Sequence, residues 1–516
     1  MGNFVVDNKR FIKNLLMQIL SIAFSLLINF FLTPFLIKNL GVGVYGFVGL
    51  ANDFVSYLDI ATIALNSMAA RFITISLEKK DIELANKQFN SVLFGNSILM
   101  GIVFIPSVFF ICNLEKFFKV DYEYLLDIKL LWGMIFLGFV LTCITSVFGI
   151  AAFSKNRLYV LSNIKIGSNI IKAMLLYAIF SVFCPHVYYI GLVTLLCTLY
   201  VFMINRYYTA RLLPEMEIKY KHFSSSEIIT ICSAGSWMII NKLSGLLAKG
   251  FDLLLSNFFI SSYAMGTLLI ARVMPAVALS FLGQISSVFA PRVISAYARN
   301  DISFIYREMI FSMKLLGIIS SAVLAIIFGV GKEFYQLWVP SQDVQYLYKL
   351  TMVGCIDLVF ALPQESFWNI MMAANKVRLP TLTLLAEGGL SLIIVIVSMS
   401  AVSDDEIKLI IIAGVSSFFG MIRSLLFMPV YAAYCLKIDW KSFYPIIVKN
   451  SVLFLLACFL IFLLTAYFDI NTWAEFILLS LISTLLVALC GYVILLDKED
   501  RCYINRSINR YISKEV

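Results

Sequence analysis

Long runs of apolar residues, each about 20 residues in length, recur along the whole chain between short polar segments. A helix of about that length crosses the ~30 Å hydrocarbon core of a bilayer. Backbone groups inside lipid must be hydrogen-bonded within the protein, so these runs are predicted to be helices. A membrane β-barrel would instead show shorter segments of alternating polarity. The pattern therefore predicts an all-α integral membrane protein.

The apolar runs predict about 14 transmembrane helices joined by short connections, the longest at 207–226 and 331–346. No extramembrane domain is expected, because no connection is long enough to form one. The predicted spans lie at 14–38, 44–68, 88–112, 128–151, 157–182, 187–206, 227–250, 262–290, 308–330, 347–372, 379–401, 407–433, 449–468 and 474–496.

Composition agrees with this interpretation. Hydrophobic residues make up 61% of the chain and charged residues 14%, against about 25% charged residues in soluble domains. The first apolar run is too long for the core of a signal peptide, so it is expected to remain as the first span. Ten scattered cysteines without a Cys-x-x-Cys pair and only two histidines predict neither a disulfide framework nor a zinc site, and no cofactor is expected.

Lys and Arg are distributed unevenly between the two sides of the predicted membrane. One set of loops and both termini contain 26 of them, and the opposite loops contain about five. Because cytoplasmic loops carry the excess of Lys and Arg, both termini are predicted to be cytoplasmic. The net charge of +9 comes mostly from these loops, so no nucleic-acid partner is expected.

Weak internal similarity suggests a repeat of six spans. The turn at 152–158 reads AFSKNRL, and the turn at 373–379 reads AANKVRL, 221 residues later. The pair at 45–46, Tyr-Gly, is similarly matched by Tyr263 and Gly266. Transporters are commonly built from such repeats around a central site.

The repeat predicts four parts of the chain. They are an N-terminal lobe at 1–222, a C-terminal lobe at 223–440, two additional helices at 441–496 and a basic cytoplasmic tail at 497–516. The tail has isoleucines at helical spacing among basic residues, which is typical of an amphipathic helix on an anionic membrane surface, and a disordered basic tail is the alternative.

Charged residues also lie inside the predicted spans, where each costs roughly 2.5–3.5 kcal/mol at the bilayer centre. The candidate substrate-binding cations are Lys165, Lys172, Lys242, Lys249, Arg272, Lys314 and Arg423. The candidate acids for ion coupling or charge pairing are Asp53, Asp59, Asp357, Glu365 and Glu387.

These charges allow more than one interpretation. Inward cations from both lobes favour a wet, electropositive cavity for an anionic substrate, because low-dielectric walls focus their field. One or two acids would then carry a coupling proton or sodium ion. Alternatively, the acids and cations pair with each other as structural charges, and Lys249 and Lys314 extend their amines to the membrane surface.

The segment 32–41, LTPFLIKNLG, followed by Tyr45 and Gly46, resembles the start of the Wzx-type polysaccharide flippases. This family belongs to the superfamily of multidrug, oligosaccharidyl-lipid and polysaccharide exporters, which also contains the lipid II flippase. The resemblance implies a MATE-like fold, in which two pseudo-symmetric six-helix lobes surround a central cavity and two C-terminal helices follow. The family has no sharply defined catalytic signature, so it assigns no catalytic residue.

The resemblance also implies a function. The expected substrate is an undecaprenyl-diphosphate-linked oligosaccharide, an O-antigen or capsule precursor, moved from the cytoplasmic to the periplasmic leaflet of the bacterial inner membrane. Expected partners are this lipid-linked glycan, membrane lipids and the polysaccharide polymerase machinery. The alternatives are a polytopic polysaccharide polymerase or ligase, and a multidrug or lipid II transporter of the same fold. Short, cation-poor outer loops disfavour an enzyme.

Overall fold

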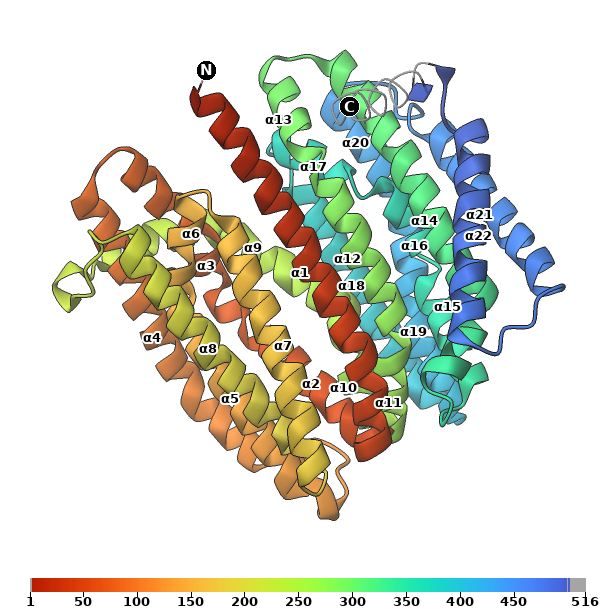
Figure 1. The fold of residues 1–516 in the computed structure, drawn as a ribbon, viewed down its shortest axis with the longest axis horizontal. Helices are drawn as coiled ribbons and strands as arrows, with labels where there is room; N and C mark the ends of the chain where they lie inside the picture. Colours follow the sequence, from red (N-terminus) through yellow and green to blue (C-terminus); the bar gives the residue numbers. More distant parts are fainter. Residues whose placement is uncertain (1, 499, 502–516) are drawn as a thin grey trace. The chain divides into compact units, whose positions relative to one another are not determined.

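The computed structural model describes residues 2–498, 500 and 501. Every regular element in this part of the chain is a helix, as the apolar pattern predicted (Figure 1). Most of the predicted basic tail, from 502 onward, lies outside the described residues. The helices form two compact units: an N-terminal unit of Met1–Leu246 and Gly250–Thr267, and a C-terminal unit of Leu247–Lys249 and Leu268–Val516.

Long helices make up the N-terminal unit. Helix α5 packs against α8, α8 against α7, and α7 against α1, while α3 packs against α4 and α9. A short helix, α6, follows α5, and α10 follows α9. The elements are α1 (Gly2–Leu40), α2 (Val42–Leu58), α3 (Ile60–Glu78), α4 (Ile82–Cys112), α5 (Leu125–Thr145), α6 (Ile150–Ser154), α7 (Leu158–Val182), α8 (Tyr188–Leu212), α9 (Ser225–Gly245), α10 (Asp252–Phe259) and the start of α11 (Ser262–Ala271).

In the C-terminal unit the longest helix, α14, packs against α12, α15, α21 and α22. Met309 and Met313 of α14 are fully buried with Phe367 and Phe443 in one apolar core. The elements are α12 (Val273–Ser287), α13 (Ala290–Ala298), α14 (Ile302–Trp338), α15 (Val344–Cys355), α16 (Leu358–Ala361), α17 (Phe367–Ala373), α18 (Arg378–Ala401), α19 (Asp405–Ile422), α20 (Met428–Leu436), α21 (Tyr444–Thr465) and α22 (Trp473–Ile494).

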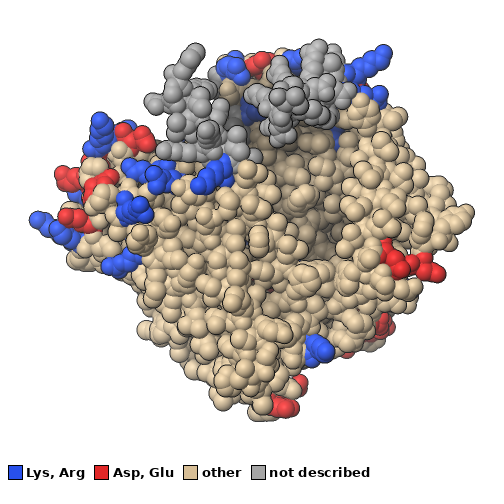
Figure 2. Space-filling view, viewed as in Figure 1, with Lys and Arg blue, Asp and Glu red and all other residues tan. Residues whose placement is uncertain are grey.

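Among the described residues, 12 helices are long and apolar enough to cross a membrane, or 13 if α15 and the bent segment after it count as one span. The predicted span at 227–250 is not one of them, since Asn241 and Lys242 interrupt the apolar residues of α9. The predicted span at 44–68 has the wrong boundaries: the helix breaks at Asp59, and α3 continues to Glu78. Figure 2 shows that charged side chains on the visible face gather near the helix ends and leave the band between them nearly free.

The predicted repeat is visible in local structure. Lys80 and Asn300, 220 residues apart, both adopt left-handed backbone conformations at a helix end. Each is followed by an aspartate, Asp81 or Asp301, whose carboxylate accepts the backbone N–H three residues further on. This bond caps the N-terminus of α4 and of α14. The same turn chemistry therefore recurs in both units.

The glycines of the repeat also lie in contact. A Cβ atom on Gly46 of α2 would lie 2.9 Å from the backbone of Gly266 in α11, so both positions require glycine for the helices to meet. These two residues are again 220 apart.

The register predicted at the Lys-x-Arg turn is wrong. The left-handed residues of the two turns are Asn156 and Asn375, which are 219 residues apart and not 221. The N–H that follows each of them donates to a carbonyl five residues earlier, from Arg157 to Ala152 in the first turn. The two turns are equivalent in structure. The identical residues of the two sequences are offset by two positions from this structural equivalence.

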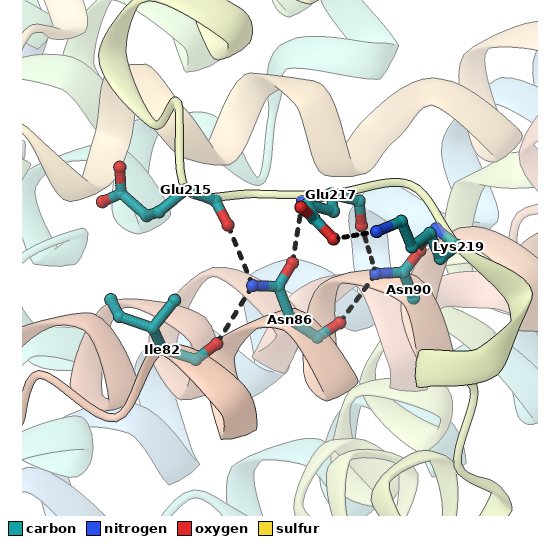
Figure 3. A network of polar contacts seen from close by, with 6 residues as sticks. All are labelled: Ile82, Asn86, Asn90, Glu215, Glu217 and Lys219. Carbon is teal, nitrogen blue, oxygen red and sulfur yellow. Dashed lines mark hydrogen bonds and ion pairs between the residues drawn. The ribbon is translucent and has the colours of Figure 1, made fainter.

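An asparagine ladder on α4 fixes the segment that follows α8 (Figure 3). The Asn86 amide donates to the Glu215 carbonyl over 3.0 Å and accepts the Glu217 N–H over 2.8 Å. One turn later, Asn90 donates to the Glu217 carbonyl over 2.7 Å and accepts the Lys219 N–H over 3.0 Å. The two side chains thus satisfy an extended backbone as a neighbouring strand would.

We expect Asn90→Ala to release this segment. Asn90 is fully buried, and its loss leaves two backbone groups without partners, which costs about 1–3 kcal/mol of unfolding free energy. Trypsin should then cleave faster at Lys219 and Lys221, as measured by limited proteolysis of the purified protein. Asn113→Ala is the control, because the half-buried Asn113 side chain donates to the Phe109 carbonyl of its own helix. Equal cleavage of both variants would contradict the role of the ladder.

Candidate functional site

Arg423 and Glu387 form a buried ion pair in the C-terminal unit. The Arg423 Nε and a Glu387 carboxylate oxygen are 2.6 Å apart, and the two side chains are 18% and 6% exposed. Glu387 lies within α18, and Arg423 follows α19. A charge this far from water requires a partner, because the desolvation of an unpaired ion costs several kcal/mol.

A second pair lies beside the first. Lys249 Nζ is 2.7 Å from an oxygen of Asp357, whose side chain is 8% exposed. Arg272 donates to the Lys249 carbonyl over 2.9 Å, which holds the backbone of the lysine in place. These three residues lie in separate predicted spans, and the structure brings them together.

The two pairs meet at Gly420 of α19. A Cβ atom there would lie 3.0 Å from Oδ2 of Asp357 and 3.3 Å from Oε1 of Glu387, so the absent side chain makes room for both carboxylates. Glu365 lies within electrostatic reach of Arg423. Lys249, Asp357, Glu365, Glu387 and Arg423 therefore form one cluster, which we call the ion-pair cluster.

Four of these five charges lie at irregularities in their helices. Lys249 and Arg423 each lie on a π-helical turn, Leu246–Gly250 and Arg423–Phe427. Asp357 lies at a 43° bend after α15, and Glu365 ends a short 3₁₀ turn. Such irregular turns are frequent at functional sites, and transporters place their substrate and ion sites at broken helices.

Glycine also allows the backbone of α18 to approach the first π turn. A Cβ atom on Gly388 would lie 2.6 Å from the backbone nitrogen of Ala248. Gly388 directly follows Glu387, so the close approach brings that carboxylate next to the turn that carries Lys249. A larger residue here would separate the two ion pairs.

The predicted cations fall into three groups. Those with a carboxylate partner are Lys242 with Asp59, Lys249 with Asp357, Arg423 with Glu387, and Lys314 with Asp497 and Asp500. Arg272 bonds to a backbone carbonyl. For Lys165 and Lys172 of α7, the described part of the chain supplies no carboxylate partner.

Lys314 lies apart from the ion-pair cluster. Its amine contacts Asp497 over 2.5 Å and Asp500 over 2.7 Å, and its side chain is 7% exposed. Both acids follow α22, so the lysine fixes the end of that helix to α14. The hydrogen bond from Lys314 holds the pKa of Asp497 below its usual range. Its contacts are those of a structural anchor.

In the N-terminal unit, Lys242 of α9 reaches Asp59 at the break between α2 and α3, with 3.5 Å between their charged atoms. Asp53 is half-buried in α2. A polar group that was not among the predicted site residues lies nearby: the fully buried Asn96 amide donates to Asn66 over 2.8 Å and to the Cys143 carbonyl over 2.9 Å. Asparagines inside two separate apolar runs were the available signal.

The described residues contain no group of three or more His, Cys, Asp or Glu side chains placed to share a metal ion. The cluster has three carboxylates and two cations, so with every group ionised it has a slight excess of negative charge. Its arrangement suits the exchange of ion-pair partners or the uptake of one proton or small cation.

Comparison with known proteins shows which fold this is. No family model matches the chain. An inward-facing MATE family multidrug resistance transporter of the MOP superfamily matches with a TM-score of 0.67 and 14% identity, over 83% of this chain and 99% of the other. The lipid II flippase MurJ, in an inward closed conformation, matches with a TM-score of 0.59 and 15% identity, over 92% of this chain and 99% of MurJ. The chain has the MOP-superfamily fold.

One curated relative matches by sequence. The uncharacterized membrane protein EpsK of Bacillus subtilis strain 168 is 26% identical over 430 residues, which cover 82% of this chain and 83% of EpsK. A MOP superfamily transporter from Pyrococcus furiosus, described as having a binding pocket of reverse polarity, matches in structure with a TM-score of 0.60 and 14% identity, over 84% of this chain and 97% of the other. The fold class predicted from sequence is confirmed.

We expect Arg423→Gln to destabilise the MOP fold of this chain by about 3–5 kcal/mol, because it leaves the Glu387 carboxylate buried without its cation. The double variant Glu387→Gln, Arg423→Gln should recover most of that loss. Thermal unfolding of the purified proteins in detergent measures both effects. Lys408→Gln removes a pair with Asp405, whose side chain is 64% exposed, and should cost less than about 1 kcal/mol. Additive losses in the double variant would show that the pair is not coupled.

Proposed function

We propose that this protein is a flippase that moves an undecaprenyl-diphosphate-linked oligosaccharide repeat unit from the cytoplasmic to the periplasmic leaflet by alternating access. The observation that carries the proposal is the MOP fold with ion pairs at its broken helices. Helix breaks at membrane depth are where transporters of several folds bind substrates and coupling ions. The excess of Lys and Arg in one set of loops supports cytoplasmic termini.

The fold comparison is compatible with a lipid or a drug as the substrate: the lipid II flippase matches over 92% of this chain, and the MATE family transporter matches with the higher TM-score, 0.67 against 0.59. Lys165 and Lys172, which have no carboxylate partner among the described residues, favour an anionic lipid, because cations at membrane depth attract a diphosphate and repel the organic cations of many multidrug transporters. A polysaccharide polymerase or ligase remains the alternative from another class of protein.

In this proposal the ion-pair cluster couples binding to movement. An anionic headgroup, or a proton or sodium ion, competes with one member of the Lys249–Asp357 or Arg423–Glu387 pair. The released partner then favours a different arrangement of the π turns that carry the cations. A ligand shifts the equilibrium between the two arrangements of these turns only by the difference in its affinity for them.

The proposal is tested by depleting the protein in its own bacterium and locating the lipid-linked glycan with a membrane-impermeant label. We expect single repeat units to accumulate in the cytoplasmic leaflet. Units that reach the periplasmic leaflet without being polymerised would contradict the flippase proposal and favour a polymerase. If no lipid-linked glycan accumulates, the substrate belongs to another class, and drug export is the next activity to measure.

We also expect the double variant Lys165→Gln, Lys172→Gln to lower the translocation rate at least about tenfold, since it removes two cations that attract the headgroup. The same leaflet assay measures the effect in cells that express equal amounts of protein. Lys408→Gln is the control, because Lys408 pairs with Asp405 at the start of α19. Equal translocation by the double variant and the control would show that the α7 cations are dispensable.

A further inference from the structure

Three oxygen atoms surround one buried nitrogen inside the N-terminal unit. The nitrogen is the side-chain amide of Asn96 on α4, a helix that packs against both α3 and α5, and Asn96 is fully buried. It lies 2.8 Å from Oδ1 of Asn66 on α3 and 2.9 Å from the Cys143 carbonyl oxygen of α5. Oγ of Ser146, at the end of α5, is 3.2 Å from the same nitrogen.

The three oxygens also lie close to one another. Oγ of Ser146 is 3.1 Å from Oδ1 of Asn66 and 2.9 Å from the Cys143 carbonyl oxygen. The amide nitrogen of Asn96 has two hydrogens and the Ser146 hydroxyl has one, whereas each oxygen offers two lone pairs. Lone pairs therefore exceed the side-chain hydrogens that face them, so this point in the fold is rich in negative partial charge.

The other end of the Asn96 amide has the opposite shortage. Its Oδ1 is buried and accepts no hydrogen bond from the described residues. A half-turn of the amide would exchange its oxygen and nitrogen, which are nearly alike in size. Four oxygens would then face one another, an arrangement that is repulsive by itself and that a hard cation stabilises, because such ions take oxygen ligands.

A row of polar atoms connects these oxygens with Asp59. Asp59, Thr62 and Asn66 are spaced three and four residues apart, which places them on one side of the helix. Oγ1 of Thr62 lies 3.4 Å from an Asp59 carboxylate oxygen and 3.8 Å from Sγ of Cys143. The Asp59 side chain is 36% exposed and lies 3.5 Å from the Lys242 amine. A cation that reaches Asp59 therefore meets polar atoms as far as the buried oxygens.

We propose that Asn66, Asn96, Ser146 and the Cys143 carbonyl form a binding site for a sodium ion. Their oxygens are uncharged, which suits a monovalent ion better than Ca²⁺ or Mg²⁺, because those ions are bound through carboxylates. The end of α5 supports this assignment: a 3₁₀ turn, Ser146–Gly149, interrupts the helix, and transporters bind ions at broken helices. Sodium binding itself does not depend on the proposed flippase function, and its use as the coupling ion rests on that function.

The test is thermal unfolding of the purified full chain in detergent, at constant ionic strength, with Na⁺ replaced by K⁺ or choline. An ion that binds only the folded protein raises its unfolding temperature, so Na⁺ should do so saturably and choline should not. Ser146→Ala removes one oxygen and should weaken Na⁺ affinity at least about tenfold. The matched control is Ser97→Ala on α4, whose hydroxyl donates to the Leu93 carbonyl of its own helix, and it should keep the wild-type affinity.

Asn66→Asp tests the same site by a gain of binding. It adds a carboxylate to the group of oxygens, so Ca²⁺ should raise the unfolding temperature of this variant and leave that of the wild type unchanged. A network of purely structural hydrogen bonds would not acquire this response. Asn163→Asp, at an exposed position of α7, is the control and should not respond to Ca²⁺.

Three results would overturn the sodium site. They are equal Na⁺ affinity of Ser146→Ala and Ser97→Ala, equal stabilisation of the wild type by Na⁺, K⁺ and choline, and a Na⁺ response that Glu387→Gln abolishes while Ser146→Ala retains it. The last result would place the ion at the ion-pair cluster. Each of them leaves the flippase proposal standing, because the leaflet assay tests that proposal separately. Failure of the leaflet assay with sodium binding intact would remove the coupling role and keep the site.

Discussion

The low-dielectric interior of a membrane protein requires buried charges to be neutralised, and this constraint organises the C-terminal unit. The Arg423 and Glu387 side chains are 18% and 6% exposed, and their charged atoms lie 2.6 Å apart. Lys249 and Asp357 form a second pair beside them. Apolar residues of similar size would often stabilise a buried site as well as such pairs do. A fold that keeps both pairs therefore points to a role beyond stability.

The paired charges lie at breaks in their helices. The π turns beneath Lys249 and Arg423 leave backbone groups outside the regular ladder, and the bend at Asp357 does the same on the facing helix. Gly388 and Gly420 let the backbones and carboxylates approach closely. In the proposed mechanism, the two ion pairs on these irregular turns exchange partners as access alternates.

The internal repeat gives the two units equivalent local features. Asp81 and Asp301 cap equivalent helices, and Gly46 meets Gly266 at one contact. The two copies have diverged in their chemistry: buried charges are paired in the C-terminal unit, while α7 of the N-terminal unit keeps two amines without a carboxylate partner among the described residues. In the proposed function, the C-terminal unit supplies the charges that exchange partners and the N-terminal unit supplies the cations that attract an anion.

Much of the fold could be predicted from sequence, because apolar runs of membrane length are a strong signal. The charged residues of the site were also identifiable, since a charge within an apolar run is expensive. Their partners were not, because Lys249 and Asp357 are 108 residues apart and only packing brings them together. The π turns and the break at Asp59 leave no periodic signal, which is why the second span was predicted with wrong boundaries.

We propose that the ion-pair cluster takes part in transport and also holds the C-terminal unit together. The most direct measurement is the translocation of a fluorescent undecaprenyl-diphosphate oligosaccharide in proteoliposomes that contain the double variant Glu387→Gln, Arg423→Gln. If the cluster takes part in transport, the double variant should be a folded protein whose translocation rate is at least about tenfold lower than that of the wild type. A folded double variant that translocates at the wild-type rate would contradict it.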